Sequence, residues 1–216
     1  EATLKCCFQF MALTPSTMLP LDTSMPFFEL SVVQGTNPGG DIYPRNLLTI
    51  RSTNLQLKPV LLMALCAHCP FVKHIEDQIS LLDRDYFSRV QMLGIASNSL
   101  VTHPQDGPKQ LAVQSQKQGW HFPYLFDAEQ SLAISLQAAC TPEFFLFAPS
   151  QDGVQKLRYR GQLDNSRPGN NVEVTGDDLR GALDAVLEGR DVSLDQKPSI
   201  GCNIKWHPGK EPSWFS

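Results

Sequence analysis

The pattern of apolar and polar residues along the chain predicts alternating strands and helices. Unbroken apolar runs at 59–65 and 90–96 have the length expected of strands that are buried on both faces. Between them, apolar residues recur at three- and four-residue steps from Val72 to Tyr86, which predicts an amphipathic helix. The order strand, helix, strand favours a right-handed parallel crossover, so we expect a sheet that is at least partly parallel.

The rest of the chain continues this α/β pattern. A short apolar segment at 27–33 is predicted to be an edge strand or one arm of an N-terminal hairpin. Residues 144–147 and 154–160 flank a turn that contains Pro, Asp and Gly, which predicts an antiparallel hairpin. Further elements are predicted as helices at 108–118, 129–138 and 178–189 and as a short strand at 122–127.

Length and composition favour one elaborated domain over two. The chain has 216 residues, 42% of them hydrophobic, which is enough apolar material for one full core. We assign 1–18 to an N-terminal extension, 19–190 to the folded domain and 191–216 to a C-terminal tail. That tail is too apolar for plain disorder, so we expect it to pack back on the domain. Met11 is a candidate natural start, which leaves 1–10 as an addition to the folded chain.

The net charge and the cysteine content restrict the partners and the cellular compartment that we expect for the protein. A net charge of -4 leaves no basic surplus for nucleic acid, and no run approaches the ~20 apolar residues of a membrane span. Residues 5–13 only faintly resemble a secretory signal, because Gln9 interrupts the apolar stretch. Six unevenly spaced cysteines fit a reducing compartment better than a disulfide scaffold. We expect a soluble cytoplasmic protein, and a plastid or thylakoid-associated location stays open.

The motif Cys66-Ala67-His68-Cys69 stands between a predicted strand and a predicted helix. Unpaired N–H groups and the dipole at a helix N-terminus favour an anion and lower a thiol pKa. We therefore expect Cys66 to be the attacking thiolate, and Cys69, within the first helical turn, to displace the substrate thiol. His68 is expected to stabilise the thiolate, and Pro70 suits an early helical position.

The same CxxC spacing also occurs in zinc sites. No second CxxC and no histidine pair follows at zinc-finger spacing, so the strand-to-helix context favours redox chemistry. A metal held by Cys66, Cys69, His68 and either Cys140 or Cys202 is the remaining alternative. We expect neither a cofactor nor a bound metal.

Thr141-Pro142 opens the predicted hairpin after an intervening helix. A CxxC after a buried strand, followed later by such a proline, resembles the thioredoxin superfamily, in which a cis-proline faces the CxxC. The long connection between the two motifs resembles the branch of the AhpC/TSA and TlpA proteins, which inserts an extra strand and helix there. The resemblance implies a thioredoxin fold, with a central mixed β-sheet flanked by helices, and a thiol-disulfide oxidoreductase.

More narrowly, the chain resembles a bacterial and cyanobacterial peroxiredoxin-like group of thioredoxin-family proteins from about Leu19 to Trp206. The segments that carry this likeness are 68–73, 123–127, 159–164, 166–170 and 199–202. The resemblance implies that Pro142 shapes a protein-substrate site to which Thr141, Pro70 and Phe71 contribute. The implied partners are protein thiol or disulfide substrates and a recycling reductant of the thioredoxin or glutathione type, and the oligomeric state stays open.

Other functions and thiols are weighed against this hypothesis. Typical peroxiredoxins place a threonine three residues before the reactive cysteine, where its hydroxyl helps to hold the peroxide. Here Met63 has that position and cannot donate the hydrogen bond, so a thiol peroxidase ranks second and a metal-binding or scaffold module follows. Cys202 and Cys140 are candidate third redox thiols, although a small buried hydrophobe is the favoured interpretation of Cys202.

Overall fold

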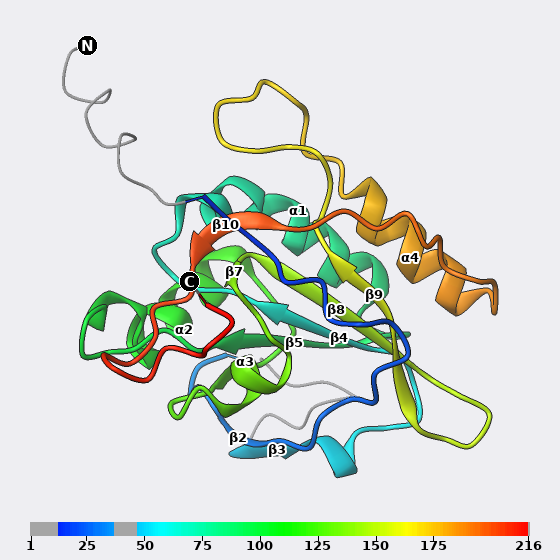
Figure 1. Ribbon diagram of the computed structural model, residues 1–216, viewed down its shortest axis with the longest axis horizontal. Coiled ribbons are helices and arrows are strands. Elements are labelled where there is room, and N and C mark those ends of the chain that lie inside the picture. The colour runs from blue at the N-terminus through cyan, green and yellow to red at the C-terminus, as the bar shows by residue number, and fades with distance from the viewer. Residues whose placement is uncertain (1–12, 37–46, 216) are drawn as a thin grey trace.

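A seven-stranded mixed sheet forms the centre of the computed structural model, which describes residues 13–36 and 47–215 (Figure 1). The strand order is β3-β2-β6-β5-β4-β8-β9. The strands are β2 Glu29–Val32, β3 Thr49–Arg51, β4 Val60–Ala64, β5 Gln91–Ala96, β6 Tyr124–Phe126, β8 Glu143–Pro149 and β9 Gln155–Gly161. Strands β4, β5 and β6 are parallel and the other pairs are antiparallel, which confirms the mixed sheet. The candidate start at Met11 and the signal-like start of the apolar stretch lie outside the described residues.

Helices cover both faces of this sheet (Figure 1). They are α1 Pro70–Tyr86, α2 Pro108–Gln118, α3 Ser131–Ser135 and α4 Asp177–Leu187, with short 3₁₀ helices η1 Ser52–Asn54 and η2 Pro104–Asp106. In β4, Leu61 and Met63 pack with α1, α2 and α4, whereas Val60 and Leu62 pack on the opposite face with α3. This double coverage explains why β4 is apolar along its whole length. Among the described helices, none combines the length and the apolar character that crossing a membrane requires.

Most predicted elements are found, and the differences have local causes. Helix α2 matches its prediction residue for residue, and Gly119 ends it in the left-handed conformation with a φ of +67°. The prediction of a helix over 129–138 is too long, because Gln130 and Gln137 both have positive φ and bound α3 on either side. Strand β2 pairs with both β3 and β6, so it belongs to a hairpin and is not an edge strand.

A small second sheet joins both ends of the chain to the middle of the sequence. It contains β1 Leu13–Pro15, β10 Ile200–Asn203 and β7 Cys140–Thr141 in the order β1-β10-β7, with antiparallel pairing throughout. The tail thus packs back as strand β10, and β1 comes from the segment assigned to the N-terminal extension. A Cβ added at Gly201 would lie 2.1 Å from the Thr141 carbonyl oxygen, so this close approach requires glycine. Figure 1 shows β10 beside β7 and close to α1.

Candidate active site

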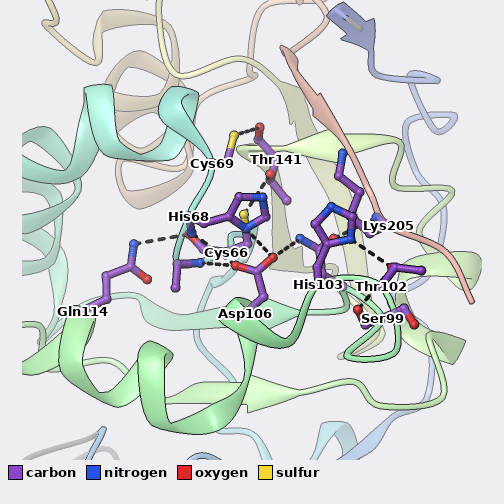
Figure 2. Close-up of polar contacts among 12 residues, drawn as sticks. Cys66, His68, Cys69, Ser99, Thr102, His103, Asp106, Gln114, Thr141 and Lys205 are labelled. Carbon is purple, nitrogen blue, oxygen red and sulfur yellow. Dashed lines mark hydrogen bonds and ion pairs between the residues drawn. The ribbon is translucent and has the colours of Figure 1, made fainter. Parts of the chain in front are cut away.

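The CxxC motif forms the turn between β4 and α1. Pro70 is the first residue of α1, as the sequence predicts, whereas Cys69 is the N-cap and not part of the first turn, so Cys66 lies three residues before the N-cap. The Thr141-Pro142 peptide bond is cis, and Thr141 faces the motif. The Cys66 Sγ lies 3.4 Å from the Thr141 hydroxyl oxygen, and the Cys69 Sγ lies 3.3 Å from the Thr141 carbonyl oxygen (Figure 2). The structure therefore brings both sulfurs together against a single residue of the cis-proline segment.

A buried carboxylate from another part of the chain holds this turn. Asp106 ends η2, and its Oδ1 accepts hydrogen bonds from the backbone N–H groups of Ala67 and His68 at 3.0 and 3.2 Å. Its Oδ2 pairs with His68 Nδ1 at 2.6 Å and accepts a hydrogen bond from Asn98 at 2.7 Å (Figure 2). Asp106 was missed by the sequence analysis, although the Pro104-to-Gly107 turn that carries it stands just before α2. It is the anion that the first N–H groups of the motif bind.

A polar network under the motif was also missed. The Gln114 amide donates a hydrogen bond to the Cys66 carbonyl oxygen at 3.3 Å and to Glu76 at 2.7 Å. The Tyr124 hydroxyl in turn donates to the Gln114 side-chain oxygen at 2.7 Å. These groups are buried and satisfy one another, which fixes the backbone at Cys66 from α1, α2 and β6.

The two thiols of the motif differ in their electrostatic surroundings. Burial raises the pKa of the Cys66 thiol, since its exposed fraction is 1%, and the neighbouring Cys69 and Asp106 raise it further. The pKa of Cys69 is lowered because the Cys202 and Cys66 thiols donate hydrogen bonds to its sulfur. The Ala67 and His68 N–H groups, which precede α1, donate to Asp106.

His68 lies over this turn and stacks on a second histidine. Its ring is paired with Asp106, and its centroid lies 5.4 Å from that of His103. Potential ligand atoms of Cys66, His68 and Asp106 lie within 4.8 Å of one another, and such a donor set suits Zn²⁺. However, Asp106 already accepts four hydrogen bonds or ion-pair contacts, so the geometry fits a hydrogen-bonded turn better than a metal site.

The other residues named from the sequence lie around the pair. Phe71 and Pro142 line one small groove together with Arg167 and Ile200. The Cys140 thiol points toward the Pro142 carbonyl oxygen, at a distance of 3.8 Å, and so lies within the cis-proline segment. Cys202 is paired with Thr141 across the β7–β10 ladder and belongs to the same buried cluster as Cys66 and Cys69.

The role of Asp106 can be tested by the Asp106→Asn variant. Loss of the negative charge should lower the pKa of the Cys66 thiol, and loss of a charged acceptor for two backbone N–H groups should cost about 1–3 kcal/mol of unfolding free energy. A pH titration of thiolate absorbance and a urea unfolding curve measure the two effects.

Asp83→Asn is a matched control for this variant. Asp83 is a second buried aspartate that pairs with a histidine, His121, at 2.9 Å, but it lies near the other end of α1, about 20 Å away along the helix. This control should lose stability and leave the thiolate titration unchanged. An equal titration curve in the wild type and Asp106→Asn would show that Asp106 only supports the fold.

The chain can now be compared with known proteins of similar sequence or structure. No protein-family model and no curated protein matches the chain. Among solved structures, it is similar to AhpC of Mycobacterium bovis at 16% identity and a TM-score of 0.54, over 83% of this chain and 98% of that one. The chain is therefore a thioredoxin-fold protein, as the resemblance implied.

Two further structures are much more similar in sequence. A conserved protein from Geobacillus kaustophilus is 40% identical, with a TM-score of 0.82, over 93% of this chain and 99% of that one. A hypothetical protein from Sinorhizobium meliloti 1021 is 36% identical, with a TM-score of 0.78, over 91% and 100%. The chain belongs to the family of these two proteins, which is a thioredoxin-fold family.

Proposed function

We propose that the protein is a thiol-disulfide oxidoreductase whose Cys66–Cys69 pair exchanges with disulfides of proteins or peptides. The observation that supports it is that both sulfurs lie at the start of α1 and contact Thr141, the residue whose bond to Pro142 is cis. Two thiols three residues apart at such a position supply an attacking sulfur and a resolving sulfur within a single site.

The reaction proceeds by two exchange steps. Cys66 gives up its proton and its sulfur attacks a substrate disulfide; one substrate sulfur leaves and takes up the proton, and the other forms a mixed disulfide with Cys66. Cys69 then loses its proton and attacks the Cys66 sulfur, which releases the second substrate thiolate and leaves a Cys66–Cys69 disulfide. A reductant of the thioredoxin or glutathione type returns the pair to the dithiol by the reverse sequence.

Roles for the neighbouring residues follow from their positions. Ala67 and His68 are half-buried, whereas Cys66 and Cys69 are both buried, so a substrate approaches the pair over the Ala67-His68 turn. Pro142, Phe71 and Thr141 form the adjoining wall of the site, and Pro70 starts the helix that supports Cys69. His68, held by Asp106, sits beside the reacting sulfur and tunes its charge.

Reduction of a small peroxide is the second candidate function, because two observations favour it. Both sulfurs are almost completely buried, which a small oxidant tolerates better than a peptide does. The Thr141 hydroxyl also lies 3.4 Å from the Cys66 Sγ and can donate a hydrogen bond there, whereas Met63 lies in the core.

One experiment separates the two functions. Reduced protein is mixed in single-turnover experiments with a disulfide-bonded peptide or with hydrogen peroxide, and the loss of thiols is followed by alkylation. Oxidoreductase function predicts a second-order rate constant at least about tenfold larger for the peptide, since exchange requires only thiolate attack on sulfur. Faster reaction with peroxide would instead support the peroxidase, and no reaction with either would exclude both.

A further inference from the structure

We propose that Cys202 is a third exchange thiol, and that Cys69 pairs alternately with Cys66 and with Cys202. The inference rests on the proposed function, because the Cys66–Cys69 disulfide is its starting state. The inference assigns a reacting thiol to the C-terminal strand β10, which packs over the site.

Cys202 lies close to the CxxC motif because of its place on β10. Strand β10 lies against β7 in a register that places Cys202 opposite Thr141, the same residue that contacts the sulfurs of Cys66 and Cys69. Cys66, Cys69 and Cys202 belong to one buried cluster, so three thiols gather around Thr141.

Backbone hydrogen bonds hold β10 in place on both sides. Its neighbour Ser199 accepts a hydrogen bond from the Ser16 N–H at 2.9 Å, and the Ile204 N–H donates to the Ala139 carbonyl oxygen at 2.9 Å. Because Gly201 has no Cβ, the strand also approaches Thr141 closely. The Cys202 thiol is thus presented to Cys69 by paired backbone, which keeps its effective concentration high.

The charge distribution supports the same exchange. The pKa of Cys69 is lowered mainly by the hydrogen bond from Cys202, and the pKa of Cys202 is raised by the same contact. The same contact holds the Cys202 sulfur beside the Cys69 sulfur, which is the atom that Cys202 attacks in the exchange.

The exchange balances without a further oxidant or reductant. Starting from the Cys66–Cys69 disulfide, the Cys202 thiol loses its proton and its sulfur attacks the Cys69 Sγ. A Cys69–Cys202 bond forms, the Cys66–Cys69 bond breaks, and the electron pair stays on the Cys66 sulfur, which takes up the proton. The product links the start of α1 to β10 and leaves Cys66 as a free thiol.

Peptide mapping under defined redox conditions tests this directly. The full-length protein is equilibrated in metal-free glutathione buffers, alkylated at low pH and digested with trypsin. Cys66 and Cys69 lie in one fragment, 52–73, whereas Cys202 lies in 191–205, because the Lys58-Pro59 and Lys197-Pro198 bonds resist cleavage. A Cys69–Cys202 disulfide therefore appears as two joined fragments, and a Cys66–Cys69 disulfide as one internally bonded fragment.

The expected result is that the joined fragments occur in wild type and become at least about tenfold more abundant in Cys66→Ser, where Cys69 has lost its other partner. Cys66→Ala serves as a second variant in case serine is not tolerated at this buried position. Cys140→Ala is the matched control, because Cys140 points toward Pro142, and it should behave as wild type.

Two results would overturn the inference, and they are distinguishable. If the joined fragments are missing from wild type and both Cys66 variants while wild type forms the Cys66–Cys69 disulfide, Cys202 takes no part and the proposed function stands. If neither wild type nor Cys202→Ser ever forms the Cys66–Cys69 disulfide, the proposed function fails and the inference fails with it.

Discussion

Replacing Cys69 by serine should lower multiple-turnover reduction of a peptide disulfide at least about a thousandfold, because the resolving step loses a thiol of high effective concentration and must use millimolar thiol from solution. The Cys66–substrate mixed disulfide should accumulate and be visible by intact mass. Cys202 cannot replace Cys69 in this step, since the sulfur it contacts is that of Cys69.

Cys140→Ala provides the comparison for this prediction, because it removes a buried thiol that points toward the Pro142 carbonyl oxygen. Its turnover should stay within about twofold of wild type, because the exchange steps use only the Cys66 and Cys69 sulfurs. A Cys69→Ser variant that keeps turnover within tenfold of wild type would remove Cys69 from the mechanism.

Replacing Glu143 by glutamine should stabilise the protein at alkaline pH. Glu143 begins β8 and is fully buried; its Oε2 accepts hydrogen bonds from the N–H groups of Ala139 at 2.9 Å and Cys140 at 3.4 Å. Its Oε1 has no hydrogen-bond partner among the described residues. Burial raises the pKa of this carboxyl from 4.5 to about 8, against the two N–H groups, which lower it. Glutamine keeps the accepting oxygen and has no charge to bury.

The sign of the pH effect follows from which state holds the proton. Between pH 4.5 and about 8 the folded protein keeps a proton that the unfolded chain has lost, so the wild type loses stability as pH rises and levels off above pH 8. The total loss is roughly 3–5 kcal/mol, and the Glu143→Gln variant should not show this part of the slope.

Urea unfolding of reduced protein at pH 5 and pH 9 measures the difference. Glu129→Gln is the control, because Glu129 is exposed and its substitution should leave the slope unchanged. Parallel stability profiles for wild type and Glu143→Gln would show that Glu143 is charged in the folded state and would contradict the account of this buried acid.

Elements whose stability depends on local pattern could be predicted from the sequence. The uniform apolar run of β4 and the three- and four-residue spacing in α1 fix their type, and Gly119 fixes the end of α2. The positions of Cys66, Cys69 and the Thr141-Pro142 bond follow from the order of these elements, so the centre of the candidate site could also be located. The short α3 could not, because the left-handed Gln130 and Gln137 leave no strong signal in the residue types.

The electrostatics of the site could not be predicted, because they depend on contacts distant in sequence. Asp106 reaches the motif from η2, 38 residues beyond His68, and accepts hydrogen bonds from the Ala67 and His68 N–H groups. The pairing of Cys202 with Thr141 is set by the register of β10 on β7, which no local periodicity specifies. Asp106 raises the pKa of Cys66 further and Cys202 lowers the pKa of Cys69, so both contacts shape the electrostatics of the motif.

The most direct test of the central claim is an equilibrium redox titration of the wild-type protein, with free thiols counted by mass-tagging in metal-free glutathione buffers. The account predicts a reversible two-electron couple that persists in Cys140→Ala and is lost in Cys69→Ser, whereas Cys66→Ser retains only the Cys69–Cys202 couple. If Cys66 and Cys69 stay as separate thiols across the whole range of glutathione potentials, or become protected only when Zn²⁺ is added, the protein is not a thiol-disulfide oxidoreductase.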